Sequence, residues 1–244
     1  MLQDQSVRPA PAHQRPLNRL LASLPEDAFG RLIPDLTTLP LTGNRVFYKH
    51  GDRVDYVYFP NGGVVSVMTA TADGRSVEAA TVGAEGMLGI EAFFGAGATS
   101  QNEVTIQVPD TNIEVLSAAA FRREVARGTA LQELIGRYAR ALFGQMRQSA
   151  ACTALHSIRG RCCSWLLQTH DRVHADEFVL SQGLLAIMLG VRRQSVTAVT
   201  RSLQDSGAIS YKYGHVTVLN RERLEAGSCE CYRAIRAQFD RLRL

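Results

Sequence analysis

Hydrophobic and polar residues follow one pattern near the N-terminus and another through the middle of the chain. Residues 1–16 contain three prolines and no apolar periodicity, so we expect a flexible tail. Two short amphipathic helices are predicted next, over residues 17–24 and 25–34. The runs that follow are short, β-branched or aromatic, and separated by turn residues. The predicted strands are 44–49, 56–59, 64–70, 76–82, 103–108 and 112–116. Their even spacing is typical of an antiparallel barrel or sandwich.

Further along, the period becomes helical. A short helix is predicted over residues 118–126 and a longer one from residue 129 to about residue 150. We predict that one set of residues in the long helix, spaced close to the 3.5-residue repeat of a two-stranded seam, forms a dimer interface. This set is Leu131, Ile135, Tyr138, Leu142, Gln145 and Ser149. Leu134, Phe143 and Met146 widen the apolar stripe, so the alternative is a helix buried within one subunit.

The C-terminal third has the pattern of a helix-turn-helix. Its predicted elements are a helix (158–170), a strand (177–180), two helices (181–189 and 192–206) and a hairpin (209–213 and 215–219). Ala186 lets two helices cross closely, and Gly190 supplies the left-handed conformation of the turn between them. A structural helix pair is the alternative from this spacing alone. The hairpin favours a winged helix instead.

The exposed side of the second helix carries groups that suit DNA. Arginine can donate two hydrogen bonds to guanine, and glutamine can pair with adenine in the same way. Serine and a helix N-terminus suit a phosphate. The predicted DNA contacts are Ser181, Gln182, Arg192, Arg193, Gln194, Ser195, Thr197, Ala198, Arg201, Lys212 and His215.

The distribution of charge supports a polyanionic partner for the C-terminal part. Between Arg75 and Arg122 there is no Lys or Arg, but there are six acidic residues. From residue 156 onward, thirteen Lys and Arg stand against eight Asp and Glu, a net charge of +5. No apolar run approaches the ~20 residues of a membrane span, and no signal peptide is recognised. We therefore expect a cytoplasmic protein without a membrane partner.

The sequence contains few motifs that would indicate a metal, redox or catalytic site. His50 is the only histidine between Leu17 and Thr153, which disfavours a metal-dependent enzyme on the predicted strands. No nucleophile elbow or phosphate loop is present, so we expect neither an enzyme nor a cofactor.

The five cysteines are expected to be free thiols. Cys162 and Cys163, near His170 and His174, are candidates for a metal or redox site, with core packing and helix capping as the alternative. The pair Cys229-x-Cys231 is ambiguous, because such close positions rarely converge on one metal. We predict no metal site.

These motifs resemble the Crp/Fnr family of bacterial transcription regulators over nearly all of the chain. Residues 161–172 look like the helix before the family's DNA-reading unit, and residues 189–197 like its turn and recognition helix. Residues 57–60 and 85–89 look like β-roll segments of one subgroup. The resemblance implies an α+β fold with an antiparallel β-roll of the cyclic-nucleotide-binding jelly-roll type, a long dimerisation helix and a C-terminal winged helix-turn-helix. The implied divisions are a tail (1–16), a β-roll sensor (17–118), the dimerisation helix (119–152), the DNA-binding domain (153–226) and a helical extension (227–244).

The resemblance also implies a function. It is that of a homodimer that reads a pseudo-palindromic operator in double-stranded DNA, acts with RNA polymerase and responds to a small-molecule signal at the β-roll. Where family members read bases with Arg, Glu and Arg, this chain has Arg193, Gln194 and Ala198, so its half-site preference is expected to differ.

The effector is not identified by the resemblance. The implied pocket is Gly89, Ile90 and Glu91, where the family's phosphate-binding cassette would lie. Because no Arg or Lys accompanies these residues, cyclic-nucleotide binding by the usual mode is not expected. The absence of cysteines before Cys152 disfavours the iron–sulfur mode. The alternative function is a β-roll ligand-binding module whose helical tail binds protein, although exposed arginines are poor anchors for a protein partner.

Overall fold

The computed structural model describes residues 15–41, 43, 45–109 and 112–244. The predicted tail, residues 1–16, therefore lies outside the described residues except for its last two positions. Three short helical segments follow: α1 (Arg19–Ala22), α2 (Glu26–Leu32) and the 3-10 turn η1 (Ile33–Asp35). Within the described ranges, no helix has the length and apolar character needed to cross a membrane.

The β-roll consists of two antiparallel sheets, of order β1-β7-β3 and β2-β6-β4-β5. Its strands are β1 (Thr37–Pro40), β2 (Val46–Tyr48), β3 (Tyr56–Pro60), β4 (Val64–Ala70), β5 (Ser76–Val82), β6 (Glu103–Val108) and β7 (Asn112–Ser117). The last six match predicted strands, although residue 44 lies outside the described residues. The sequence pattern does not predict β1, because this segment is too short to alternate and ends in a proline.

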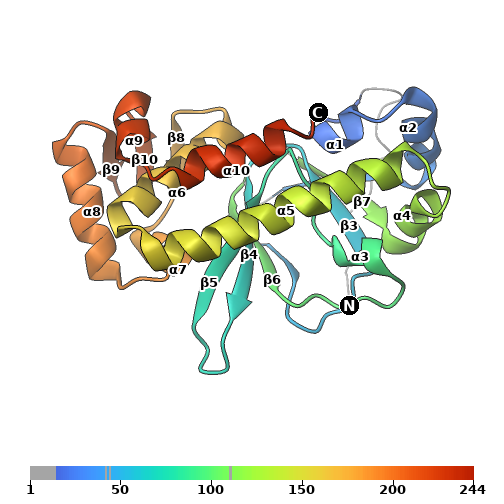
Figure 1. Cartoon of the computed structure of the whole chain (residues 1–244), viewed down its shortest axis with the longest axis horizontal. Helices are drawn as coiled ribbons and strands as arrows, with labels where there is room; N and C mark the ends of the chain where they lie inside the picture. The colour runs from blue at the N-terminus through green and yellow to red at the C-terminus, as the bar shows by residue number, and fades with distance from the viewer. Residues whose placement is uncertain (1–14, 42, 44, 110–111) are drawn as a thin grey trace.

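Two helices connect the β-roll to the rest of the molecule. Helix α4 (Ala118–Val125) is capped by the Ser117 hydroxyl, which accepts from the Ala120 amide at 3.1 Å. Helix α5 (Ala130–Leu155) then runs along the length of the molecule (Figure 1), past its predicted end at residue 150. Helix α10 (Cys231–Asp240) runs back along α5 and packs against it.

The C-terminal domain is a winged helix. Its elements are α6 (Ile158–Val173), β8 (Glu177–Val179), α7 (Gln182–Leu189), α8 (Arg193–Asp205), β9 (Ile209–Lys212), β10 (His215–Val218) and α9 (Arg221–Gly227). The strands form an antiparallel sheet of order β8-β10-β9. Along the chain, the hairpin β9–β10 directly follows α8, as the sequence predicts.

The buried side chains form two clusters. One fills the β-roll and joins it to α4, α5 and α10, with Phe59 and Tyr138 fully buried. The other is the core of the winged helix, but it also contains Val64, Met68 and Val108 from the β-roll. The DNA-binding domain is therefore packed directly onto the second sheet of the sensor.

Candidate DNA-binding surface and its connection to the sensor

Helices α7 and α8 are joined by the tight turn that the sequence predicts. Gly190 ends α7 in the left-handed conformation, with φ 60° and ψ 39°, which glycine adopts without a Cβ clash. Val196 and Leu203 of α8 are fully buried, and Ala186 of α7 is buried beside them. The apolar stripe of α8 is therefore used inside the domain, and its opposite face is turned to solvent.

Most of the predicted DNA contacts lie on that solvent-facing surface. The exposed ones are Ser181, Arg192, Arg193, Gln194, Thr197, Ala198, Arg201, Lys212 and His215. Gln182 and Ser195 are partly buried. Arg192 precedes the first turn of α8 and Arg193 opens it, so these two arginines lie at the helix N-terminus, where the aligned backbone amides also favour an anion.

Several of these side chains already have partners within the domain. The Ser181 hydroxyl caps α7 by accepting from the Leu184 amide at 3.1 Å. The Thr197 hydroxyl lies 2.8 Å from Oε1 of Gln182 and ties α8 to the first turn of α7. Nδ1 of His215 lies 3.0 Å from Glu177. These contacts orient the surface from which the arginines project.

The wing adds one residue that the sequence analysis does not select. Tyr213 lies at the tip of the β9–β10 hairpin, is fully exposed, and has a left-handed φ of 51°. Lys212 precedes it and Gly214 follows. A solvated aromatic ring beside a lysine at a hairpin tip is suited to contact a nucleic-acid backbone, and its position in a turn between two strands is the signal that could have identified it.

The predicted effector residues lie where the β-roll passes into α3 (Glu91–Phe94). Gly89 is buried with φ 77°, and a Cβ at this position would lie 2.7 Å from the Tyr48 hydroxyl. Tyr48 donates a hydrogen bond to the Tyr56 carbonyl and so fills the space in front of Gly89. Burial raises the pKa of Glu91. A role for Gly89, Ile90 and Glu91 in effector binding stays a prediction.

The structure places the predicted dimer seam of α5 inside the subunit. Leu131, Ile135, Tyr138, Leu142 and Gln145 are all buried within the single subunit, and Ser149 is half-buried. The physical reason is that α5 is covered twice, by the β-roll on one side and by α10 on another. The sequence pattern correctly indicates burial, but the covering elements come from the same chain.

Two of these residues connect α5 to the sensor. The Tyr138 hydroxyl donates to the Met87 carbonyl at 2.9 Å, and a Cβ on Gly86 would lie 2.7 Å from that hydroxyl. The Gln145 amide donates to the Thr81 hydroxyl at 3.1 Å. Tyr138 therefore seats α5 against the loop that leads to the predicted effector residues.

Polar contacts hold the winged helix to the β-roll at two carboxylates, the half-buried Glu78 and the buried Glu85. Nε1 of Trp165 donates to Glu78 at 2.8 Å. Burial raises the pKa of Glu78 to about 7, although hydrogen bonds from Ser66 and Trp165 oppose the shift. Arg172 forms an ion pair with Glu85 at 2.7 Å. Burial opposes ionisation of Glu85, but Arg172 outweighs it and holds the pKa of this carboxyl below its usual value.

The helix-turn-helix itself also touches the sensor. The sulfur of Met188 lies 3.4 Å from the Ser66 hydroxyl, and a Cβ on Gly190 would lie 3.1 Å from the Val77 side chain. The turn that precedes the recognition helix therefore rests on strands β4 and β5. A shift of β4 and β5 at this point would therefore also move the turn and the start of α8.

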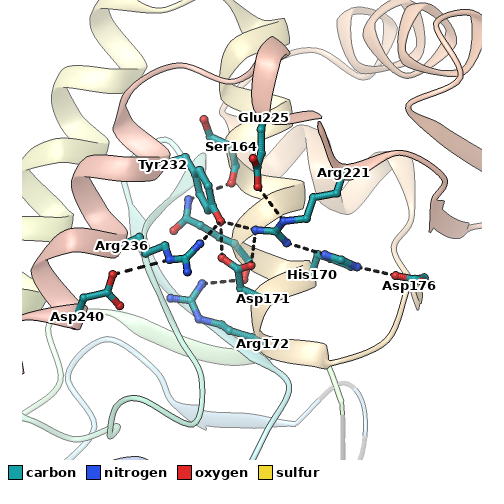
Figure 2. Close-up of polar contacts among 11 residues, drawn as sticks. Ser164, His170, Asp171, Arg172, Asp176, Arg221, Glu225, Tyr232, Arg236 and Asp240 are labelled. Atoms are coloured by element: carbon teal, nitrogen blue, oxygen red, sulfur yellow. Dashed lines mark hydrogen bonds and ion pairs between the residues drawn. The ribbon is translucent and has the colours of Figure 1, made fainter. Parts of the chain in front are cut away.

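A polar network fixes the C-terminal helices to α6 (Figure 2). Asp171 accepts from the Tyr232 hydroxyl at 2.7 Å and pairs with Arg221 at 2.7 Å. Arg221 also pairs with Glu225 at 2.8 Å and hydrogen-bonds His170 at 2.8 Å. Through this network, α9 and the first turns of α10 are tied to α6 of the DNA-binding domain.

The histidines and cysteines are arranged differently from the predicted candidates. His170 is engaged by Asp176 and Arg221, and His174 ends α6 in a left-handed conformation, so neither forms a site with the buried Cys162 and Cys163.

Another set comes together instead. Cys229 and Cys231 both lie beside Cys152 and His156, so their closeness in sequence does not prevent them from converging. Burial and the neighbouring thiols raise the pKa of the Cys152 thiol.

Comparison with known families matches both halves of this architecture. A cyclic nucleotide-binding domain is matched over residues 39–127, which include most of the β-roll. A Crp-like helix-turn-helix domain is matched over residues 160–226, which include α7, α8 and the wing. The chain belongs to the Crp/Fnr family of DNA-binding transcription regulators. This confirms the α+β fold class and the resemblance found in the sequence.

Solved structures share the fold of this Crp/Fnr regulator. FixK2 from Bradyrhizobium japonicum has a TM-score of 0.66 at 17% identity, covering 80% of this chain and 98% of that one. The c-di-GMP responsive global regulator CLP from Xanthomonas campestris gives 0.65 at 16%, covering 80% and 100%. A CRP-family transcriptional regulator from Thermus thermophilus gives 0.60 at 21%, covering 78% and 95%. A comparison with curated protein sequences found no match.

Proposed function

We propose that this Crp/Fnr regulator is a homodimer that reads a pseudo-palindromic operator by placing α8 in the major groove. The observation that carries this proposal is the division of α8 into a buried apolar face and an exposed basic N-terminal face. A two-fold dimer presents two such helices to half-sites about one helical turn, or ~34 Å, apart. A protein of this kind works where the chromosome is, so a cytoplasmic location is part of the proposal.

Base reading is assigned to the exposed start of α8. Arg193 is suited to guanine and Gln194 to adenine, while Ala198 and the Thr197 methyl can contact a thymine methyl. Arg192, Arg201 and Lys212 are suited to phosphates, as are Ser181, Ser195 and His215 at the edges of the surface. Gln182, which is tied to Thr197, would position α7 across the backbone.

The second copy of the chain is placed on the outer face of α5. Phe143 is 49% exposed and stacks near Phe94, which is 61% exposed, with ring centroids 6.2 Å apart. Gly136, Phe143 and Ala150 recur every seven residues along this face, the repeat of a helix pair. Exposed aromatic rings of this size favour burial against an apolar partner. This face replaces the buried residues Leu131, Ile135, Tyr138, Leu142 and Gln145 as the proposed interface.

The signal is proposed to pass from the β-roll to the recognition helices through packed contacts. Tyr138 couples the loop at Gly86 to α5. Glu78 of β5 and Glu85 of the loop after β5 couple the β-roll to α6. A small molecule that moved the loop before α3 would change both sets of contacts. A standard cyclic nucleotide is not the proposed effector, because no Lys or Arg lies between Arg75 and Arg122 in the sequence and the Tyr48 hydroxyl occupies the space beside Gly89. Contact with RNA polymerase is proposed as for other regulators of this type, and no catalytic step is required.

The alternative is that the C-terminal domain binds protein instead of DNA. The exposed residues of α8 include arginines and a glutamine rather than large apolar anchors, which favours DNA.

Selection of bound sequences from random duplex DNA by the purified protein, at a stated salt concentration, tests the proposal. We expect an enriched inverted repeat whose half-sites lie about one helical turn apart. The Arg193→Ala protein serves as the control, and its selected motif should be degenerate at one position of each half-site. Recovery of unrelated sequences by the intact protein, both alone and with added cell extract, would contradict DNA reading and favour the protein-binding alternative.

A further inference from the structure

Four possible metal ligands converge where α5 ends. Cys152 lies in the last turn of α5, and His156 follows that helix as its C-cap. Cys229 lies between α9 and α10, and Cys231 opens α10. One ligand atom from each residue lies within 4.8 Å of the ligand atoms of the other three. The fold therefore brings two pairs that are distant in sequence to one point.

Two of the separations between ligand atoms are those of a tetrahedral site around one ion. Sγ of Cys152 lies 3.5 Å from Sγ of Cys229, and Sγ of Cys231 lies 3.4 Å from Nδ1 of His156. Zinc–thiolate and zinc–imidazole bonds of about 2.3 and 2.0–2.1 Å place neighbouring ligand atoms about 3.4–3.8 Å apart in a tetrahedron. An iron–sulfur cluster would instead spread its ligands over several metal atoms. We propose that Cys152, His156, Cys229 and Cys231 bind one Zn²⁺ ion.

The surrounding polar groups are suited to this role. Nε2 of His156 lies 3.1 Å from Glu230, so a proton held there leaves Nδ1 available to bind the metal. Metal-bound histidines commonly donate their second nitrogen to a carboxylate in this way. The Gln148 amide donates to Sγ of Cys231 at 3.1 Å, and the Ser164 hydroxyl lies 3.1 Å from Sγ of Cys229. Donors directed at sulfur stabilise thiolates rather than buried neutral thiols.

The donor set defines the class of ion and of site. Three thiolates are soft ligands and imidazole is a nitrogen ligand suited to zinc, so this set selects zinc over magnesium or calcium. All four positions are supplied by the protein, which is the pattern of a structural zinc site rather than a catalytic one. Binding displaces protons from the thiols, and the ion offsets the mutual repulsion of three thiolates held close together.

The position of the site gives it a mechanical consequence. His156 and Ser157 are the link between α5 and α6, because Ser157 caps α6 directly after His156. Cys229 and Cys231 fix the start of α10, which packs on α5. The ion therefore ties the long helix, the hinge and the C-terminal helix together, and it sets the direction in which the winged helix leaves α5. The effect of the ion on operator binding rests on the proposed function. The binding of the ion by the four residues does not.

Cobalt substitution of the full-length protein tests the site. The protein is stripped of metal with a chelator under anaerobic, reducing conditions and titrated with Co²⁺. We expect one Co²⁺ per subunit, with the visible d–d bands of a tetrahedral site and a thiolate charge-transfer band, both abolished by Zn²⁺. Cys152→Ala and Cys229→Ala should lose these bands. Cys162→Ala, which alters a buried cysteine outside the cluster, should keep them, and Glu230→Gln should weaken the affinity by about 10-fold.

The outcomes separate this proposal from the DNA-binding function. A reduced, folded wild-type protein without the tetrahedral spectrum would overturn the site, as would a disulfide between Cys152 and Cys229 that forms equally with Zn²⁺ present. Equal loss of the spectrum in Cys162→Ala and Cys152→Ala would overturn the ligand assignment. Chelation should also lower the melting temperature and weaken operator binding. Unchanged operator affinity after metal loss would refute the hinge role alone, whereas a zinc-loaded protein that selects no DNA motif would count against the proposed function instead.

Discussion

Helices α5 and α8 are both amphipathic, but their apolar stripes meet different surroundings. In α8 a narrow stripe with Val196 and Leu203 is buried in its own domain, and the opposite face is charged and open. In α5 the buried residues spread around much of the helix, because the β-roll and α10 cover it from two sides. The comparison teaches that a charged face opposite an apolar stripe identifies a surface for a partner. An apolar stripe alone shows burial but does not say which element covers it.

The largest expected effect comes from comparing the two faces of α5. Tyr138→Ala should lower the free energy of unfolding by about 3–5 kcal/mol, since it opens a cavity and removes the hydrogen bond to Met87. Phe143→Ala should cost less than ~1 kcal/mol in the monomer but should weaken the dimer. Urea unfolding and sedimentation, each at fixed protein concentration, measure the two quantities. A dimer that is unaffected by Phe143→Ala would show that the proposed interface is wrong.

Tyr138→Phe separates the role of the Tyr138 hydroxyl from that of the buried ring. This change keeps the ring and removes only the hydroxyl that donates to Met87, so the fold should be retained. Operator affinity, or its response to the effector, should change if this contact transmits the signal. If both are unchanged, α5 is not the transmission element at this position.

The free energy of unfolding should depend on pH through Glu78, whose carboxyl holds the domain of α8 to the sensor. The folded-state pKa of Glu78, about 7, is above its ordinary value of 4.5. The folded protein therefore binds more protons between these values, and the contribution of Glu78 to stability is present below pH 4.5 and lost as pH rises through 7. Glu78→Gln removes this loss. Compared with wild type, the variant should be similarly stable near pH 4.5 and more stable at pH 8 by roughly 3 kcal/mol at most.

Trp165 offers the measurement, because it is the only tryptophan in the chain and it contacts Glu78 directly. Denaturant unfolding followed by its fluorescence, at several pH values, gives both stability curves. Ser66→Ala is the matched control, since it removes another hydrogen bond to Glu78 but leaves the carboxyl. Parallel pH profiles for wild type and Glu78→Gln would show that the pKa of Glu78 is the same in the folded and the unfolded protein.

On the exposed face of α8, Arg193→Ala should weaken operator binding by about 1–3 kcal/mol and relax one base position of each half-site. The reason is the loss of two hydrogen bonds to a guanine edge. Arg241→Ala, an exposed arginine at the end of α10, is the control and should have little effect. Binding measured on the selected operator and on single-base variants distinguishes the outcomes. An even loss across all sequences would assign Arg193 to a phosphate.

The smallest effect is expected at the wing. Lys212→Ala should weaken binding to all sequences alike and reduce the slope of log K against log salt by about 1, as for one phosphate contact. Tyr213→Ala tests the neighbouring residue at the hairpin tip. A change of sequence preference in either variant would indicate that the wing reads bases.

The sequence by itself determined the order and type of most elements. Alternation located six β-roll strands, and the spacing of Ala186 and Gly190, with the hairpin behind it, located the helix-turn-helix. The sequence also identified the exposed residues of α8, because local periodicity indicates which side of a short helix is polar. Its boundaries were least accurate at the end of α5, where no proline or glycine stops the helix before His156.

Tertiary structure decided what each buried or reactive group faces. It showed that the predicted seam of α5 is covered by strands and a helix of the same chain, and that Glu78 and Glu85 join the sensor to α6. It also brought Cys152 and His156 to Cys229 and Cys231. Periodicity cannot supply such information, because it records the local environment of a residue, whereas contacts between segments far apart in the chain depend on how the whole chain folds.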